Sequence, residues 1–326
     1  MKKQKSNRRA IILNKCSDGI SAQPLIDSLS SEIKKKYTDF TPAKNEIEID
    51  NLIDNSLPND IFIIGGKKIM MTASRLGLLF REKNINARCV FIPACPYNSI
   101  PFNDFSYGFG LALNWCAGLG NDMLSIRKNS RENCRIGIIE IDGDDNGWLT
   151  AGAASFTSEK EKVLFLTCET IFDEEKFCTA VSKKIKKYNT AVIFTSQEIR
   201  NAELKRINTA NQSISAALSK IITKKLDLET FAFIINPGKM FDSMHLSKQD
   251  VKLGTLVGKA AVRLALRTAK QGTNILIANR FSNDGKNKIS FEIVPLFEAI
   301  NTPRKLPKNY KTLIDTKFIT KKLNHK

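Results

Sequence analysis

Three aspartates gather in one short segment, "DGDDNGW", directly after an apolar run that predicts a β-strand. Clustered carboxylates can hold Mg²⁺ or act as a general acid and base. The alternative is structural: Asp and Asn side chains in a turn bond to nearby backbone and cap the helix that follows, here at Trp148. Both interpretations stay open for Asp142, Asp144 and Asp145, and we favour the structural one.

A second polar loop follows the apolar segment "VFIP". In open α/β sheets, ligands and catalytic groups meet at the carboxyl ends of the strands. This loop offers Cys95, Tyr97, Asn98 and Ser99, and it has no carboxylate before Asp104. It is therefore placed like an active-site loop but lacks an obvious general base.

The pair Gly65-Gly66 stands between a predicted strand and a predicted helix. Backbone N–H groups at a helix N-terminus can bind anions, so this turn is a candidate phosphate site. Alternatively, the two glycines only permit a tight strand-to-helix turn. The pair of glycines does not decide between these interpretations.

Histidine and cysteine usage excludes several kinds of site. The only histidines are His245 and His325, so we expect neither a histidine-based metal site nor a Ser-His-Asp triad. The seven cysteines form no CxxC pair, which is typical of reduced thiols in the cytoplasm. No apolar run is long enough to span a membrane, and Ala10–Leu13 is too short for a signal-peptide core. We expect a soluble, cytoplasmic protein.

The formal net charge is +18. A strongly basic protein often meets a polyanion such as nucleic acid, an anionic membrane surface or an acidic protein. The lysines are spread widely, however, and on predicted helices they are expected to form solvated faces. We favour that reading for the bulk charge and place any polyanion contact at the basic ends, Lys2–Arg9 and Arg304–Lys326.

Short apolar runs alternate with amphipathic stretches along the chain. Strands are expected at Ala10–Leu13, Asp60–Ile64, Arg88–Ile92, Arg135–Ile141, Lys162–Leu166, Thr190–Phe194, Phe231–Ile235 and Asn274–Ile277. Helices are expected at Ala22–Lys36, Ile69–Lys83, Gly108–Ser125, Trp148–Phe156, Glu174–Lys186, Thr209–Lys225 and Lys252–Ala269. This alternation predicts an α/β protein with two doubly wound, mainly parallel sheets, and 326 residues suffice for two such lobes.

Taken in order, these segments resemble the phosphofructokinase family, which transfers phosphate from ATP or pyrophosphate to fructose 6-phosphate. "IFIIGGKKI" is similar to the family's I-G-G-D-G-S loop, "FIPACPYNSI" to I-P-K-T-I-D-N-D-I, and "DFSYGFGLALN" to D-x-T-F-G-F-D-T-A. "IGIIEIDGDDNGWLTAGAA" resembles V-E-V-M-G-R-x-A-G-W-L-A, and "INPGKMFD" resembles P-G-x-x-Q-R. The resemblance covers most of the chain, and it rests on order and spacing because no single motif is intact.

The resemblance also shows what has changed on the catalytic and donor sides. Tyr97 stands where the family has the Asp that takes the proton from the sugar hydroxyl, and a phenol with a reference pKa near 10 is a poor base at neutral pH. Ser99 replaces the second Asp of that motif. Lys67, next to Lys68, replaces the Asp that helps to hold Mg²⁺. Of the family's first glycine-rich donor loop, only Gly19 remains.

The acceptor side differs in a similar way. Asp144, after Gly143, stands where the family has an Arg, and Asp242 stands where P-G-x-x-Q-R ends in Arg. A carboxylate there repels phosphate, and two unit charges about 4 Å apart interact by roughly 4 kcal/mol at an effective dielectric of 20. Ser196 replaces a sugar-binding Glu. The resemblance therefore implies that the fold has been kept while the reaction groups have been replaced.

The resemblance implies a first, donor-side lobe of residues 1–107 plus 243–280 and a second, acceptor-side lobe of residues 108–242. The tail, residues 281–326, is expected to pack on the second lobe. The altered positions named above are expected to line one cleft between the lobes.

Three functional hypotheses follow. The first is a catalytically silent homologue that acts by binding, without a cofactor, as a homo-oligomer or with a related chain. The second is a divergent phosphotransferase that uses Mg²⁺ with ATP or pyrophosphate, for which Asp142 and Asp145 are the weak metal candidates. The third is a basic adaptor for nucleic acid or ribonucleoprotein, which only the charge supports.

Overall fold

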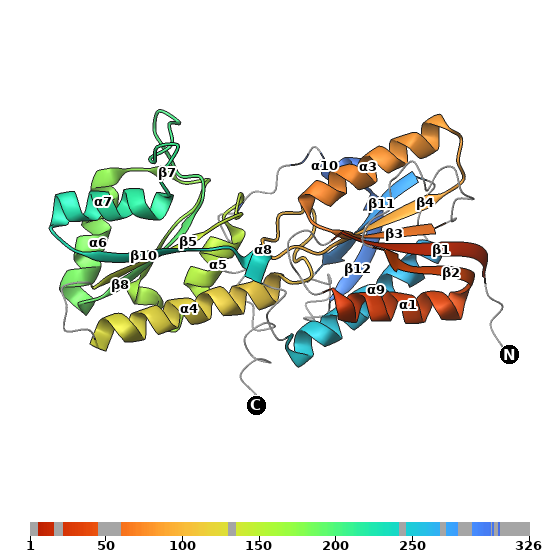
Figure 1. Ribbon diagram of the computed structural model, residues 1–326, viewed down its shortest axis with the longest axis horizontal. Coiled ribbons are helices and arrows are strands. Elements are labelled where there is room, and N and C mark those ends of the chain that lie inside the picture. Colours follow the sequence, from red (N-terminus) through yellow and green to blue (C-terminus); the bar gives the residue numbers. More distant parts are fainter. Residues whose placement is uncertain are drawn as a thin grey trace. The chain divides into compact units, whose positions relative to one another are not determined.

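The computed structural model describes residues 6–15, 22–44, 60–129, 135–240, 246–267, 272–279, 289–300, 302 and 306. The chain forms two compact units, and the first unit is built from two segments, Met1–Phe109 and Gly238–Arg304. The second unit is built from Gly110–Pro237 (Figure 1). Gly19 and Asp242 lie outside the described residues.

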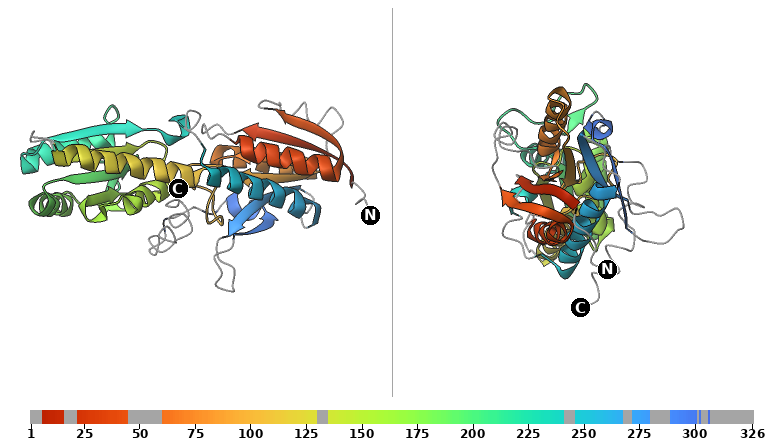
Figure 2. Two further views of the ribbon diagram at one scale, coloured as in Figure 1. Left: turned by 90° about the horizontal axis from the view of Figure 1, so that it is seen from below. Right: turned by 90° about the vertical axis from the view of Figure 1, so that its right-hand side faces the viewer.

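The first unit is a six-stranded sheet with helices on both faces (Figures 1 and 2). Its strand order is β12 (Ser290–Pro295), β11 (Gly272–Asn279), β4 (Arg88–Pro93), β3 (Asp60–Gly65), β1 (Ser6–Lys15) and β2 (Tyr37–Lys44). Its helices are α1 (Gln23–Lys36), α3 (Lys67–Glu82), α8 (Pro237–Met240), α9 (Lys248–Arg267) and α10 (Phe297–Ile300). Among the described strands of this sheet, only the β11–β12 pair is antiparallel.

Continuous apolar sequence explains the central strands of this sheet. The segment "DIFIIG" of β3 is buried along its whole length, as expected for a parallel strand that is covered on both faces. Helices α1 and α9 pack against each other, while α3 and α10 contribute to the hydrophobic cluster that contains Ile61, Ile63 and Phe91. Because β1 leads into α1 and β3 leads into α3, the carboxyl ends of β1 and β3 flank a topological switch point.

The second unit has a four-stranded parallel sheet in the order β10 (Thr230–Ile235), β5 (Ile136–Ile141), β8 (Ala191–Ser196) and β6 (Val163–Leu166). Its helices are α4 (Phe109–Asn129), α5 (Trp148–Phe156), η1 (Lys160–Lys162), α6 (Glu174–Tyr188) and α7 (Ile214–Leu226). A small parallel pair, β7 (Ile171–Phe172) and β9 (Arg200–Asn201), lies outside the main sheet.

Helices cover both faces of this second sheet. Helices α6 and α7 share a hydrophobic cluster with Ile193 of β8, whereas Gly120 of α4 lies against the next residue of that strand, Phe194. Successive strand residues point to opposite faces, so α4 lies on the face opposite α6 and α7. The buried carboxylate of Glu140 accepts hydrogen bonds from the backbone N and the Oγ of Ser215, at 2.8 and 2.7 Å, and so fixes the start of α7.

Three expectations from the sequence need correction. Residues 290–295 were expected in a tail on the second lobe, but they form β12 beside β11 in the first unit. Strand β1 begins at Ser6, and the Nε of Arg9 lies 2.7 Å from the Oδ2 of Asp39. Arg9 is therefore part of the sheet and does not belong to a basic tail. Helix α7 begins at Ile214 rather than near Thr209, because Ser213 caps it by accepting a hydrogen bond from the N–H of Ala216.

Candidate functional site

In the first unit, the glycine turn follows β3 at the topological switch point. A side chain at Gly65 would collide with Ile69, since an added Cβ would lie 2.7 Å from the Cβ of Ile69. Gly66 is the N-cap of α3 and has extended backbone. Packing therefore explains Gly65, while Lys67 and Lys68 place two exposed ammonium groups on the first turn of the helix. The first turn of α3 is therefore positively charged.

The loop after β4 folds back on itself. The backbone N–H of Cys95 donates to the carbonyl of Tyr107 at 3.0 Å, and the N–H of Tyr107 donates to the carbonyl of Pro93 at 3.2 Å. Inside the loop, Asn98 has a positive φ of 52°. Its amide donates to the carbonyl of Asp104 and accepts from the N–H of Ser106, so it holds the loop closed.

The two loop residues that the resemblance aligns with catalytic carboxylates are both buried. The side chain of Tyr97 is 8% exposed, and its hydroxyl oxygen accepts a hydrogen bond from the backbone N–H of Gly238 at 3.2 Å. Ser99 is 5% exposed, and its Oγ lies 3.3 Å from the Sγ of Cys95. Their polar groups are thus engaged within the protein.

In the second unit, the acidic turn after β5 bends back onto the start of α5. Asn146 accepts a hydrogen bond from the N–H of Trp148, and Asp144 accepts one from the N–H of Thr150 at 2.8 Å. Gly143 and Gly147, with φ of 89° and 67°, supply the left-handed conformations of the turn. Asp144 and Asn146 therefore cap α5, which is the structural role that the sequence allowed for this turn.

Asp144 is fully buried and belongs to a chain of side-chain hydrogen bonds. Its Oδ2 also accepts from the Oγ1 of Thr150 at 2.7 Å, and that Oγ1 lies 3.0 Å from the Oγ of Ser196, at the end of β8. The second carboxylate oxygen, Oδ1, and the Nδ2 of Asn146 are buried without a hydrogen-bond partner. The structure thus brings together two of the residues singled out in the sequence, Asp144 and Ser196, through Thr150.

Burial decides the charge of this carboxyl group. Loss of water around the carboxyl group of Asp144 raises its pKa to about 7. The hydrogen bonds from Thr150 lower the pKa, but their effect is smaller than that of burial. The nearby carboxylates of Glu169 and Asp145 raise the pKa further. Asp144 therefore keeps its proton to a much higher pH than an exposed aspartate does.

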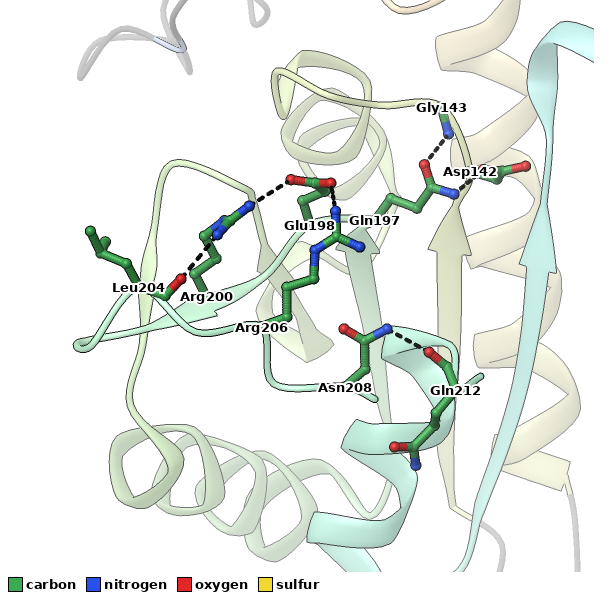
Figure 3. Close-up of polar contacts among 9 residues, drawn as sticks. All are labelled: Asp142, Gly143, Gln197, Glu198, Arg200, Leu204, Arg206, Asn208 and Gln212. Atoms are coloured by element: carbon green, nitrogen blue, oxygen red, sulfur yellow. Dashed lines mark hydrogen bonds and ion pairs between the residues drawn. The ribbon is translucent and has the colours of Figure 1, made fainter. Parts of the chain in front are cut away.

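Asp142 lies in a separate and more open network (Figure 3). The Nε2 of Gln197 donates to its Oδ1, and the Nδ2 of Asn236 donates to its Oδ2 at 2.7 Å. The Oε1 of Gln197 in turn accepts from the N–H of Gly143 at 3.2 Å. These residues come from the carboxyl ends of β5, β8 and β10, where a parallel sheet binds ligands.

Next to this network, the loop after β8 has a charged contact. Glu198 pairs with both Arg200 and Arg206, and Arg200 also donates to the carbonyl of Leu204 (Figure 3). Asp145 is exposed. In the described part of the chain, no three His, Cys, Asp or Glu residues form a group that could hold a metal ion.

Sequence reasoning missed Thr150, Gln197 and the N–H of Gly238. Gln197 follows the apolar strand β8 directly, so its place at a strand end was a usable signal. Thr150 lies inside a predicted helix, and Gly238 acts through its backbone N–H, so neither residue gave a signal in the sequence.

None of the described helices is long and apolar enough to span a membrane.

The family model for phosphofructokinase matches residues 25–265. The pyrophosphate–fructose 6-phosphate 1-phosphotransferase of Methylococcus capsulatus is 21% identical over 281 residues, which cover 81% of this chain and 66% of that protein. The ATP-dependent 6-phosphofructokinase of Entamoeba histolytica is 23% identical over 255 residues, which cover 73% of this chain and 56% of that protein. The chain thus spans less than two thirds of the length of these relatives.

The fold is also that of solved phosphofructokinase structures. The pyrophosphate-dependent phosphofructokinase from Nitrosospira multiformis superposes with a TM-score of 0.72 at 16% identity, over 93% of this chain and 87% of that one. The corresponding protein from Marinobacter aquaeolei gives a TM-score of 0.71 at 18% identity, over 93% of this chain and 86% of that one. The mainly parallel sheets of this chain confirm the α/β class that the sequence predicted.

Proposed function

The chain belongs to the phosphofructokinase family, and we propose that it is a non-catalytic member that acts by binding, as a regulatory or structural homologue. The observation that carries this proposal is the state of Tyr97. The resemblance aligns it with the catalytic base, yet its hydroxyl is buried and accepts the N–H of Gly238. A phenol that serves as an internal acceptor is badly placed to take a proton from a substrate.

The other aligned positions support the same proposal. Lys67 puts a cation where the family has a metal-binding Asp, and a cation repels Mg²⁺. Asp144 puts a buried carboxyl group where the family has an Arg that binds phosphate, and its oxygen is used to cap α5. By the resemblance, three separate parts of the reaction are replaced, and two of the replacements, Tyr97 and Asp144, are engaged in hydrogen bonds within the protein.

The direct test is an activity assay of the purified full chain. Fructose 6-phosphate is supplied with ATP and Mg²⁺ in one series and with pyrophosphate and Mg²⁺ in another. We expect no turnover above that of a blank in either series. Turnover that is lost in Asp142→Asn or Asp145→Asn, but kept in the surface control Asp227→Asn, would overturn the proposal.

One observation favours a second candidate, a divergent phosphotransferase. The network of Asp142, Gln197 and Asn236 lies where three parallel strands end, and it is partly accessible. Such a carboxylate could act as a base for a different sugar phosphate. Calorimetric titration with ATP, pyrophosphate and sugar phosphates tests this candidate, which requires binding that Asp142→Asn weakens. No binding at millimolar concentration contradicts it.

The remaining parts of the proposal concern partners. We infer a homo-oligomer or an assembly with a related chain, without a cofactor, in the cytoplasm. If the second candidate is correct, we expect the protein to use Mg²⁺ with ATP or pyrophosphate. Any polyanion contact is assigned to the basic ends of the chain, most of which lie outside the described residues.

A further inference from the structure

Helix α9 presents a row of positively charged side chains to solvent. Lys252, Lys259, Arg263 and Arg267 are all exposed, and these four residues form the α9 row. With 3.6 residues per turn, they lie within about 80° of the helix circumference and extend over about 22 Å of its length. Leu256, which is 39% exposed, lies between them on the same side. The row is therefore a nearly straight line of positive charge.

The charge of the α9 row is not compensated by neighbouring acidic residues. No carboxylate in the described part of the chain forms an ion pair with any residue of the row. On α1, by contrast, Lys35 is paired with Glu32 at 2.9 Å. The acidic residue of α9 itself, Asp250, accepts a hydrogen bond from the N–H of Ser247 at the start of the helix. The row is thus open to a negatively charged partner.

The spacing of the row is unfavourable for the helix itself. Lys259, Arg263 and Arg267 follow one another at intervals of four residues, and like charges at that spacing destabilise a helix. A cation in the last turn interacts favourably with the helix dipole, which accounts for Arg267. Lys259 and Arg263 lie farther from the C-terminus, and both are exposed, so neither the dipole nor packing accounts for them. A partner that brings negative charge does.

Helix α1 runs beside α9 in the same direction, on one face of the first sheet (Figures 1 and 2). An added Cβ at Gly254 would lie 3.0 Å from the backbone N of Leu25, and one at Gly258 would lie 2.9 Å from that of Leu29. The two helices are therefore packed closely at a constant offset. Continued along both helices, this register brings the exposed Lys34 level with the second half of the α9 row. Lys34 adds positive charge there.

Two carboxylates flank the row on the side of α1. A groove of about 390 Å³ lies between the two helices, and its α1 wall contains Asp27 and Glu32, while its α9 wall contains Thr255 and Lys259. A flat anionic surface, such as a lipid bilayer, would meet these carboxylates when it lay across both helices. A rod that lies along α9 would meet the row without them. The arrangement of charge therefore favours a linear polyanion.

Among linear polyanions, the side chains of α9 favour a nucleic-acid duplex. The phosphates of a duplex form a regular line of charge, and Lys and Arg supply many of the contacts to them. Single strands are usually held by aromatic side chains on which the bases stack, and α9 contains no aromatic residue. A protein partner usually needs a central cluster of large apolar side chains, whereas the row of this described helix has one, Leu256.

From these features we infer that the α9 row binds the phosphate backbone of a nucleic-acid duplex, DNA or RNA, without reading its sequence. Each cation of the row contacts a phosphate, and Arg263 and Arg267 are each able to bind two oxygens of one phosphate group. The surface lies within the fold, separate from the basic ends of the chain. The inference goes beyond the proposed function, because none of the positions that the resemblance aligns with reaction groups of the family lies on α9.

The test measures binding of the full chain to a fluorescent DNA duplex, and to an RNA duplex of the same length, at a series of salt concentrations. Both duplexes should bind, and two unrelated sequences should bind equally, because all of them share the same backbone charge. Lys259→Gln with Arg263→Gln should make the slope of log affinity against log salt concentration less steep by about 1.8, which is about 0.9 for each lost contact. Lys259→Glu with Arg263→Glu should weaken binding at least roughly tenfold.

A matched control separates the row from the general positive charge. Lys220 and Lys224 of α7 are exposed, have the same four-residue spacing and form no ion pair with a described carboxylate. Lys220→Gln with Lys224→Gln should keep the salt slope of the unchanged chain, although it changes the net charge by the same amount. Equal losses in the α7 and α9 variants, no binding of either duplex, or a strong preference for one sequence would overturn the inference.

Further probes detect the other occupants of the row. A single strand of the same length and vesicles of phosphatidylserine and phosphatidylcholine should bind more weakly than the duplex. Tighter binding of either probe, lost in the α9 variants, would show that the inference is wrong. A change of solution mass in those variants would instead assign the row to a contact between copies of the chain. Urea midpoints of the α9 variants should match that of the unchanged chain, because the substituted side chains are exposed.

Discussion

The hydroxyl oxygen of Tyr97 lies 3.2 Å from the backbone N of Gly238, which donates a hydrogen bond to it across 141 residues of sequence. Gly238 is the residue at which the chain re-enters the first unit. The bond therefore joins the two sequence segments of that unit at the loop that follows β4.

Replacing Tyr97 with Phe should destabilise the protein. The change leaves the buried N–H of Gly238 without this acceptor, which costs about 1–3 kcal/mol. Urea denaturation measures the loss, and Tyr188→Phe, at a half-buried tyrosine on α6, is the control. If the two variants lose the same stability, the bond contributes nothing measurable.

Replacing Tyr97 with Asp should restore no phosphotransfer. The new carboxylate would be buried, Lys67 would still repel the metal, and the acceptor arginines would still be absent. A coupled assay for fructose 1,6-bisphosphate checks this expectation. Activity from this single change would show that the other positions had been misaligned. Adding Asp144→Arg should prevent folding, because residue 144 is fully buried.

The stability of the protein should fall as the pH rises from about 4 to about 7. The folded state holds a proton on Asp144, whose pKa is raised to about 7 by burial, while the unfolded chain releases it near the ordinary value of 3.8. The stabilisation is complete below the unfolded pKa and is lost as the pH passes the folded one, by about 4 kcal/mol in total. Urea midpoints across this range should show the decline. Asp144→Asn should flatten it, whereas Asp227→Asn, at an exposed aspartate that does not act on Asp144, should leave it in place.

Replacing Thr150 with Val should move that decline to higher pH. The Oγ1 of Thr150 donates to Asp144 at 2.7 Å, and this bond lowers the pKa of the carboxyl group. Its removal raises the pKa further, so Asp144 stays protonated to higher pH. Thr150→Ser keeps a hydroxyl and should keep the original midpoint. An unchanged pH profile in Thr150→Val would show that Asp144 does not cause the decline.

Replacing Arg88 with Met should be strongly destabilising. Its guanidinium group binds both carboxylate oxygens of Asp60, at 2.5 and 2.7 Å, and the carbonyl of Ala265 at 2.6 Å. Removal of one partner from a buried pair costs about 3–5 kcal/mol, because the other charge is left without compensation. Arg9→Met, which breaks the exposed pair with Asp39, should cost at most about 1 kcal/mol. Similar losses in thermal or urea unfolding would contradict this contrast.

Most of the fold was readable in the sequence because the interior strands are continuous apolar runs. Strands β3, β4, β5 and β8 are buried on both faces, and they lie within a residue or two of their expected positions. Strands β2 and β12 were missed because edge strands carry charges and prolines, which remove the apolar signal.

The sequence by itself determined the family and the α/β class, because these depend on residue types and their order. Only the tertiary structure decided what the side chains at the altered loop positions contact. Tyr97 meets Gly238, and Asp144 meets Thr150 and Ser196, through contacts between segments far apart in sequence. Burial likewise decides the protonation of Asp144, because a pKa depends on the water and charges around a group.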